Sequence, residues 1–434
     1  MRHPSPYFDR LLDFCRRTPI IDTHDHTTVC EPAYTDAIAA IMAGYFHSDI
    51  WSVSSDAQAE YLLDTSIPLE SRWPTFERMW QLTKHTGYAQ VSRRVLSHFY
   101  GIDELNLPAL LKMQENLLDL RDPLLFEKIL DDAGIVLRLE HMALDVGAMQ
   151  AGTQQMPPRS RPVIALIDYH TLSSAKDIQH IAGRLGKPAG SLGKYLEICR
   201  EIFQIHKDFG AVAFKDECAY DRSLSFSSPS CQEAEAIFDW LIANPENILP
   251  YPDGIKALED YLFHQFMDMA AALDLPVQLH TGHMAGIRNE ITKANAVLLT
   301  PVFQAHPDTR FDLFHANWPY SGEILFLVKN YPNVNLNFCW VNIIDPVYSQ
   351  QLYMQALSAV PHGKIHAHGS DYFGSADRAW AHAQITRENI ACALSEMVER
   401  EFFDIRAAEQ VAEDWLFHNP NRFYQTGLPY RPLA

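Results

Sequence analysis

The sequence predicts an α/β protein: a (β/α)8 barrel of the TIM type with a helical insertion after its first strand. Eight short apolar segments, each bounded by polar or turn-forming residues, are distributed along the 434 residues. Stretches with apolar residues at three- and four-residue spacing separate most of them. Strands that alternate with helices indicate right-handed βαβ crossovers and a parallel sheet, and eight repeats favour a closed barrel over an open sheet.

The first predicted strand begins at Pro19 and ends in the polar run that contains His24 and His26. The other seven, in chain order, are Gly134–His141, Pro162–His170, Gly210–Lys215, Leu275–His283, Arg310–Trp318, Val334–Trp340 and Lys364–Asp371. Helices are expected between most of these strands, at residues 192–209, 231–244, 258–274, 291–306, 321–332 and 350–361. A short helix at 5–17 precedes the barrel, and helices at 386–424 close the chain.

The helical insertion is predicted at about residues 29–130, within a single domain that spans residues 1–434. Segments such as 35–46, 75–102 and 107–120 have helical spacing of apolar residues, and no strand-like alternation interrupts them. We expect this insertion to fold over the ends of the strands.

Charge and composition restrict the function. Acidic residues outnumber basic residues 54 to 35, and the formal charge of −19 argues against binding to nucleic acid or to an anionic membrane. We therefore expect a small-molecule substrate. The first residues lack the apolar core of a signal peptide, and no apolar run is long enough to span a bilayer. The seven scattered cysteines include no CxxC pair, which favours reduced thiols and a cytoplasmic location.

Residues that bind metals or move protons stand at nearly every strand end. His24 and His26 are two positions apart, so they point to the same side of a strand and can hold one cation. The carboxyl ends of barrel strands converge on one face, where active sites of this fold lie. The other residues with this chemistry at strand ends are His141, Asp168, His170, Lys215, His280, His315 and Asp371.

Three histidines and one aspartate around an open position suit a catalytic divalent ion, and zinc fits best, with manganese as an alternative. Neutral imidazoles hold the ion without cancelling its charge, so a bound water becomes acidic near neutral pH. An aspartate beside that water can accept its proton, and a further histidine can polarise the substrate. By contrast, we interpret His141, His170, His283, His366 and His368 as hydrogen-bonded structural residues.

At these positions the chain resembles the amidohydrolase superfamily. The stretches 311–340, 364–374 and 411–424 are similar to its amidohydrolase-2 group, which includes hydrolases, decarboxylases and the amidohydrolase-like half of glutamine-synthetase fusions. The resemblance implies a mononuclear site in which His315 and Asp371 are catalytic. It implies the metal ligands His24, His26, His280 and Asp371.

Lys215 leaves an alternative open. Binuclear members of the superfamily have a carboxylated lysine at the end of strand four, which bridges two metals, and Lys215 stands at about that place. The segment that begins at Phe214 also resembles the glutamine-synthetase-fused group, in which we interpret the lysine as an uncarboxylated residue that binds the substrate. We favour one ion, with a second ion on carboxylated Lys215 as the alternative.

A second resemblance is to uronate isomerases. Residues 278–290 and 85–105 are similar to stretches of that group, which binds a sugar acid through an arginine and moves protons between adjacent carbons. Arg288 is the matching arginine. Trp318 and Trp340 are candidates to line the same pocket, although large aromatic residues also fill barrel rims.

The leading hypothesis is a metal-dependent hydrolase that cleaves an amide or lactone bond of a small carboxylated substrate. Lys215 and Arg288 would bind the substrate carboxylate, and the protein would assemble as a homo-oligomer. The alternatives are non-hydrolytic chemistry in the same barrel, uronate isomerisation or decarboxylation, and a catalytically silent binding module.

Overall fold

The computed structural model, which describes residues 5–26, 34–142 and 144–433, contains one sheet of eight parallel strands. The strands follow one another around the sheet in chain order, and each pairs in parallel with the next. They are β1 (Ile20–Asp25), β2 (Ile135–His141), β3 (Ser160–Ala165), β4 (Ala213–Asp216), β5 (Val277–His280), β6 (Phe311–Phe314), β7 (Val334–Asn337) and β8 (Ile365–His366).

The chain beyond β8 brings the two edges of the sheet together. β8 has only two residues, but the segment that follows it runs alongside β1. The Thr23 amide donates to the His368 carbonyl at 3.1 Å, and the Asp371 amide donates to the His24 carbonyl at 2.9 Å. These bonds close the sheet into a barrel, and the predicted (β/α)8 fold is confirmed.

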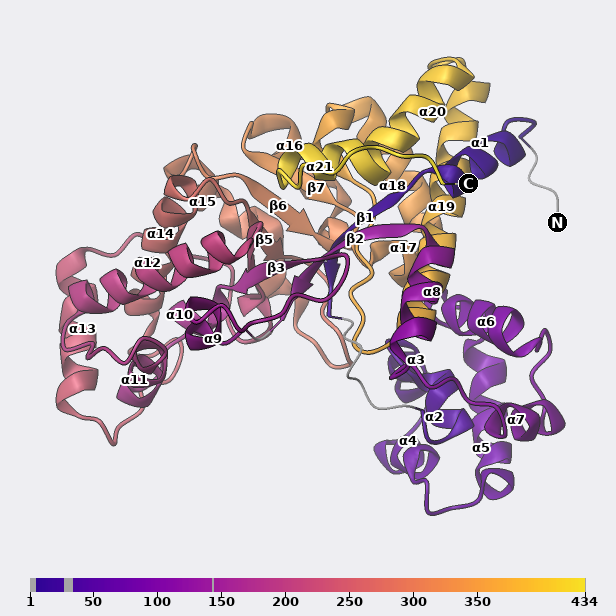
Figure 1. Cartoon of the computed structure of the whole chain (residues 1–434), viewed down its shortest axis with the longest axis horizontal. Helices are drawn as coiled ribbons and strands as arrows, with labels where there is room; N and C mark the ends of the chain where they lie inside the picture. Colours follow the sequence, from indigo (N-terminus) through magenta and orange to yellow (C-terminus); the bar gives the residue numbers. More distant parts are fainter. Residues whose placement is uncertain (1–4, 27–33, 143, 434) are drawn as a thin grey trace.

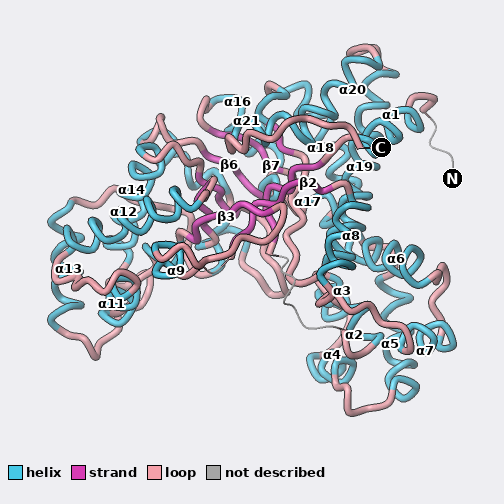
Figure 2. Tube along the Cα trace, viewed as in Figure 1, coloured by secondary structure: helices cyan, strands magenta, loops and turns pink. Residues whose placement is uncertain are grey.

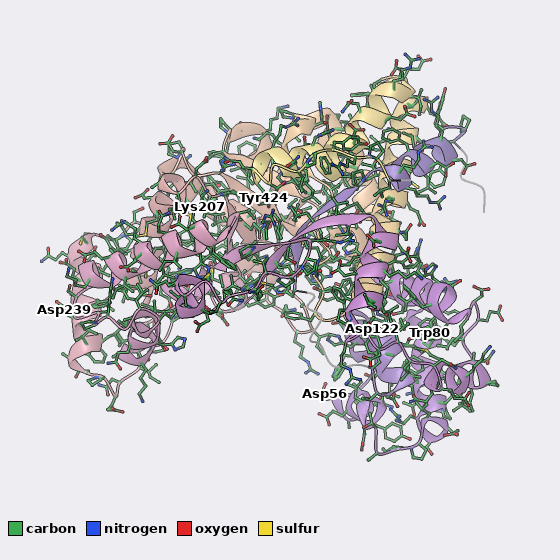
Figure 3. The ribbon with its side chains drawn as sticks, in the orientation of Figure 1. Asp56, Trp80, Asp122, Lys207, Asp239 and Tyr424 are labelled. Atoms are coloured by element: carbon green, nitrogen blue, oxygen red, sulfur yellow. The ribbon has the colours of Figure 1, made fainter. Side chains whose placement is uncertain are left out.

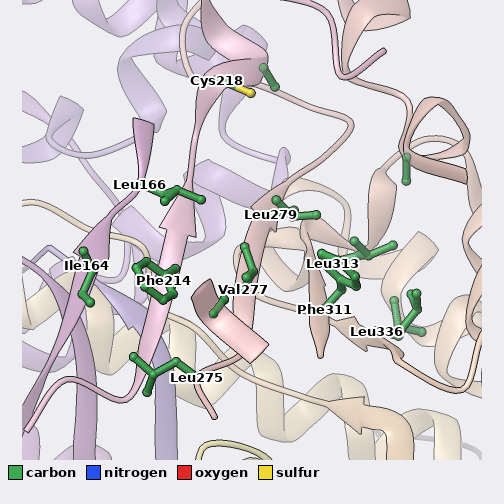
Figure 4. Packing of buried hydrophobic residues seen from close by; sticks show 14 of the residues in the cluster. Ile164, Leu166, Phe214, Cys218, Leu275, Val277, Leu279, Phe311, Leu313 and Leu336 are labelled. Carbon is green, nitrogen blue, oxygen red and sulfur yellow. The ribbon is translucent and has the colours of Figure 1, made fainter. Parts of the chain in front are cut away.

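From Phe214 of β4 to the end of β7, most apolar side chains point outward and most polar side chains point inward, as the two-residue period of a strand allows. The outward set packs against the surrounding helices, and Figure 4 shows it as Phe214, Val277, Leu279, Phe311, Leu313 and Leu336. The alternate, buried positions are Lys215, Gln278, His280, Asp312, Asn337 and His366. These polar side chains must find partners inside the barrel. Ile21, Leu137, Leu139 and Val163, from β1 to β3, form a small apolar cluster with Tyr424.

Helices surround the strands on the outside of the barrel (Figure 2). In α12 (Leu192–Phe209), Tyr195, Ile198, Ile202 and Phe203 recur at three- and four-residue spacing and are buried. Burial stabilises each such side chain by ~1.5–3 kcal/mol. The other helices outside the insertion are α1 (Phe8–Arg17), α8 (Pro123–Ala133), α9 (Val146–Gln150), α10 (Ile167–His170), α11 (Ala175–Gly183), α13 (Cys231–Ala243), α14 (Lys256–Ala272), α15 (Thr300–Ala305), α16 (Ser321–Asn330), α17 (Val341–Ile344), α18 (Pro346–Ala359), α19 (Ala376–Glu399), α20 (Ile405–Glu413) and α21 (Asn419–Phe423).

A group of helices between β1 and β2 lies at one end of the molecule, and α11–α14 lie at the other end (Figure 1). Its members are α2 (Ala37–Met42), α3 (Phe46–Ser52), α4 (Asp56–Leu63), α5 (Leu69–Thr83), α6 (Gly87–Tyr100) and α7 (Leu107–Gln114). They form a second apolar core that includes Trp80, labelled in Figure 3, and that also contains Phe314, Trp340 and Tyr372 from the barrel. The group therefore packs onto the carboxyl ends of the strands. The predicted start of the insertion, at residue 29, falls outside the described residues.

Several strands end earlier than the sequence analysis predicts. β3 stops at Ala165, and the predicted continuation to His170 is wrong because residues 167–170 form the helical turn α10. Strands five to eight also stop short of their predicted ends. Left-handed backbone lies within the predicted strands at Gly282, His315, Trp340 and Asp371, with φ of 71°, 62°, 61° and 57°, and is incompatible with an extended chain there. The closing helix α19 begins ten residues earlier than predicted, at Ala376 rather than residue 386. Within the described part of the chain, no helix is long and apolar enough to cross a membrane.

Candidate metal centre

A cavity of about 630 Å³ opens at the carboxyl ends of the barrel strands, a size typical of small-molecule sites. Its polar lining includes His24, His26, His47, Lys215, Glu217, His280 and Asp371. Tyr45, Tyr220 and Phe373 form an aromatic wall of the same cavity. Four of the predicted metal ligands therefore line one cavity, together with a carboxylate, Glu217, that the sequence analysis did not include.

His24 and His26 converge on one oxygen of Asp371. Asp371 Oδ1 lies 3.3 Å from His24 Nε2 and 3.4 Å from His26 Nε2. Charge-assisted N–H···O bonds are shorter, at ~2.7–2.9 Å. Three ligand atoms around an ion with bonds of ~2.1 Å in tetrahedral geometry lie ~3.4 Å apart. The distances from Asp371 Oδ1 to the two histidine nitrogens therefore match the spacing of metal ligands.

The position of Asp371 depends on the turn after β8. The φ of 57° at Asp371 is rare for a residue other than glycine. It is maintained by the hydrogen bond that the Asp371 backbone N–H donates to the His24 carbonyl oxygen. The Tyr45 hydroxyl, from the turn before α3, donates to the Asp371 carbonyl oxygen. Strained backbone of this kind often occurs at functional sites. A residue of the insertion thus fixes a candidate metal ligand of the barrel.

His280 and His315 face each other, with His280 Nδ1 3.0 Å from His315 Nε2. The other ring nitrogens lie against backbone carbonyls: His280 Nε2 is 2.8 Å from the His283 oxygen, and His315 Nδ1 is 3.1 Å from the Cys339 oxygen. Because a carbonyl only accepts, these two nitrogens carry the protons. Burial lowers the pKa of His280 to about 4 and that of His315 well below the usual value, so each ring is neutral with one N–H.

The two facing nitrogens, His280 Nδ1 and His315 Nε2, then both carry lone pairs. Lone pairs at this separation repel one another unless a cation or a shared proton lies near both. His315 Nε2 is also 3.9 Å from Asp371 Oδ2, which connects this pair to the first group of ligands. The donor set therefore fits a divalent cation.

Protonation states at neutral pH also suit a metal. Burial, with the charge of Lys215, lowers the pKa of His24 to about 3 and leaves it neutral. For Asp371 burial acts in the opposite direction, but His24 outweighs it and holds the pKa well below the usual range. At His26, Asp371 outweighs burial and raises the pKa above its usual value. The four candidate ligands are therefore mainly imidazoles with a free lone pair, together with the ionised carboxylate of Asp371.

Lys215 and Glu217 extend from the end of β4 into the cavity. Lys215 is 1% exposed, and its Nζ lies 3.9 Å from Glu217 Oε1 and 4.2 Å from the ring centre of Phe314. His141 Nδ1 donates to Glu217 Oε1 at 3.1 Å. Burial disfavours the charged form of Glu217, but His141 and Lys215 outweigh it and lower its pKa well below the usual value.

Asp216, between Lys215 and Glu217, points outward and pairs with buried His170 at 2.6 Å, and this contact anchors the end of β4.

The other predicted substrate-binding residues lie outside the lining of this cavity. Arg288 is 72% exposed and forms an ion pair with Asp56 of α4 at 2.8 Å. Trp340 is buried behind His315, with ring centres 5.1 Å apart. Trp318 packs against His283 at 5.2 Å. Their roles in substrate binding remain predictions.

Two turns that carry candidate residues are held close together. Gly282, after β5, has φ of +71°, and a Cβ there would lie 2.4 Å from the Trp318 carbonyl oxygen after β6. Only glycine fits this conformation and this close approach. The Thr281 hydroxyl donates to the Phe314 carbonyl at 2.7 Å. These contacts fix His280 relative to His315.

The sequence of this chain is similar to a known protein family and to a curated protein. Residues 247–426 match the family model described as amidohydrolase. Among curated proteins, the chain is 27% identical over 227 residues to the protein fluG of Emericella nidulans. That alignment covers 50% of this chain and 26% of fluG, so the chain spans about a quarter of the length of this relative.

Solved structures of the same fold include two isomerases. Glucuronate isomerase from Caulobacter crescentus superposes with a TM-score of 0.76 at 19% identity and covers 100% of this chain and 99% of its own. Uronate isomerase from Thermotoga maritima gives 0.75 at 14% identity, with 97% of each chain covered. A protein described as a metal-dependent hydrolase, from Lactobacillus casei, gives 0.64 at 16% identity, with 96% and 98% covered. The predicted resemblances to amidohydrolases and to uronate isomerases are confirmed.

Proposed function

We propose that this chain is a metal-dependent enzyme of the amidohydrolase type that hydrolyses an amide or lactone bond of a small carboxylated substrate. The observation that supports this most directly is the approach of His24 Nε2 and His26 Nε2 to one oxygen of Asp371, at 3.3 and 3.4 Å, in a cavity at the strand ends. The match of residues 247–426 to the amidohydrolase model supports the same class.

His24, His26, His280 and Asp371 would hold the ion, zinc or alternatively manganese. When bound, such an ion acts as a Lewis acid and lowers the pKa of water. Asp371 Oδ2, which faces His315, would accept the proton of the attacking water and return it to the leaving group. His315 would polarise the substrate carbonyl. The buried ammonium of Lys215 would bind the substrate carboxylate, since it is the cationic side chain in the cavity lining.

The choice of a small-molecule substrate follows from the charge of the chain. With 54 acidic and 35 basic residues, the chain favours a small-molecule substrate over nucleic acid or a membrane surface. We also propose a cytoplasmic protein that forms homo-oligomers. Gel filtration with light scattering measures the assembly state.

Metal analysis followed by a substrate screen tests this function. Protein purified without added metal is analysed by mass spectrometry and then incubated with lactones, N-acyl amino acids and carboxylated aromatic acids, with release of acid, amine or CO2 monitored. We expect about one equivalent of metal per chain and hydrolysis of at least one class, both lost in His24→Asn. Hydrolysis that persists in metal-free His24→Asn protein would contradict the proposal.

Uronate isomerisation is the second candidate, because two isomerases of sugar acids superpose over 97% or more of this chain, with TM-scores of 0.75 and 0.76. Incubation with D-glucuronate and D-galacturonate, with detection of the ketose product, separates the two candidates. A ketose that forms in wild-type protein but not in His24→Asn, without hydrolysis of the other substrates, would favour the isomerase.

A further inference from the structure

Glu217 was not among the predicted metal ligands, but its carboxylate lies close to two of them, His24 and His26. Its Oε1 lies 3.8 Å from His24 Nε2 and 3.9 Å from His26 Nε2. With these two histidines it forms one group of potential ligand atoms that all lie within 4.8 Å of one another. Its side chain is 24% exposed, so it faces the cavity and not the bulk solvent.

The spacing of these atoms fits coordination better than direct hydrogen bonding. At 3.8 and 3.9 Å, Glu217 Oε1 is too far from either histidine for a hydrogen bond. Ligand atoms around one ion with bonds of ~2.1 Å are ~3.4 Å apart in a tetrahedron, and ~3.0 or ~4.2 Å apart in an octahedron. A shift of a few tenths of an ångström brings Oε1 within that range of both histidine nitrogens.

We infer that Glu217 is a further ligand of the divalent ion, through Oε1, and that His141 orients this carboxylate. This inference rests on the proposed metal centre. His141 Nδ1 holds the same oxygen at 3.1 Å, as hydrogen-bonded partners commonly hold ligating carboxylates. Together with His280, the ion would then have ligands from the ends of β1, β4 and β5 and from the turn after β8.

Charge balance supports a second carboxylate in this site. Asp371 and Glu217 together neutralise the two positive charges of the ion, so the ammonium of Lys215 remains as the net charge that attracts an anionic substrate. Lys215 Nζ is buried, has no hydrogen bond to any residue that the structure describes, and lies 3.9 Å from Glu217 Oε1. The same ammonium opposes a second cation between Glu217 and His141. The arrangement therefore favours one ion with two carboxylate ligands.

The test compares wild-type protein with Glu217→Gln, which preserves the size and removes the charge. Metal content is measured after dialysis against a series of buffered free zinc concentrations, and the visible spectrum is recorded after Co²⁺ substitution. Glu290→Gln, an exposed carboxylate near the same face, is the matched control. Circular dichroism of the metal-free proteins checks that each variant folds, and His141→Asn tests the orienting bond.

We expect Glu217→Gln to weaken zinc affinity at least ~10-fold and to change the Co²⁺ spectrum, with a smaller loss of affinity in His141→Asn. Equal affinity and an identical spectrum in wild-type and Glu217→Gln protein would overturn the inference and leave the proposed function intact. Two ions in the wild type and one in the variant would overturn the single-ion arrangement. A wild type that holds no ion at any concentration would overturn both the inference and the proposed function.

Discussion

The barrel contains two clusters of histidine and carboxylate side chains, and they differ in how their atoms are spaced. The upper cluster consists of His24, His26, Glu217 and Asp371 at the cavity, and the lower cluster consists of Asp312, Asn337, His366 and Tyr424 in the barrel interior. In the lower cluster, Asp312 Oδ2 accepts hydrogen bonds from His366 at 2.9 Å, from Asn337 at 2.7 Å and from the Tyr424 hydroxyl. In the upper cluster, the carboxylate oxygens lie 3.3–3.9 Å from His24 and His26.

This difference separates a structural cluster from a binding cluster of the same residue types. The lower cluster stabilises the barrel because its donors already have an acceptor. Tyr424, labelled in Figure 3, comes from the chain after α21 and caps it from the C-terminal segment. The upper cluster has atoms held apart at the spacing of metal ligands, and its stabilising partner is expected to be an ion. Spacing, and not composition, indicates which cluster binds a ligand.

The largest expected effect is the loss of metal in Asp371→Asn. The variant preserves the backbone bond to His24 but removes the charge that His24 and His26 share, so we expect zinc affinity to fall by more than the ~100-fold that loss of an outer partner costs. Dialysis against buffered zinc followed by mass spectrometry measures this change. His366→Asn in the lower cluster is the control and should bind zinc as the wild type does. Loss of metal from both variants to the same extent would erase the distinction between the clusters.

Another buried histidine, His206 on α12, sharpens the comparison because it belongs to neither cluster. Within the described residues its ring nitrogens have no hydrogen-bond partner, and burial, with the charge of Arg184, lowers its pKa to about 4. In the unfolded chain the pKa of this histidine is ~6.5. Between pH 6.5 and pH 4 the unfolded state therefore binds a proton that the folded state does not, and the free energy of unfolding falls as the pH is lowered. The group contributes nothing to this slope above pH 6.5.

The expected loss from His206 alone is about 3 kcal/mol of unfolding free energy across that window, at ~1.4 kcal/mol for each pH unit. Urea denaturation of metal-free wild-type and His206→Gln protein, at pH 7 and pH 4.5, measures it. The variant should lose less stability on acidification than the wild type. Equal losses in the two proteins would show that His206 is not held neutral in the folded state.

His24 and His26 were identified in the sequence because residues two positions apart point to the same side of a strand. The same reasoning applies to the end of β4. Lys215 was identified there, and Glu217, two residues further, points to the same side, so the same rule applied again would have found it. The strand ends themselves were placed too late at β3 because Ala165 is followed by a helical turn of similar apolar composition. Sequence periodicity over four residues does not separate these two structures.

Other features of the site depend on contacts that no local pattern encodes. Tyr45 reaches the Asp371 carbonyl from the group of helices between β1 and β2, more than 300 residues away in the chain. The stretch around Arg288 is similar to a stretch of uronate isomerases in which an arginine binds the sugar acid. That similarity carries no information on the direction in which the turn after β5 points its side chains. In the structure that turn directs Arg288 to Asp56 and to solvent. Alternation along strands predicts which side a residue faces, whereas the path of a turn depends on tertiary packing.

The smallest expected effect belongs to the lower cluster and tests its structural role. In Asp312→Asn, a neutral amide oxygen takes the place of Oδ2, the charged acceptor of all three hydrogen bonds. The new N–H₂ takes the place of Oδ1, which is buried and has no hydrogen-bond partner among the described residues. We expect a loss of about 2 kcal/mol in unfolding free energy, the typical cost of leaving buried polar groups without partners. Urea denaturation measures the loss, and zinc binding should be unchanged because Asp312 lies outside the upper cluster. If the variant instead lost zinc at full stability, Asp312 would have to support the metal centre, and the lower cluster would be part of the site and not only of the barrel.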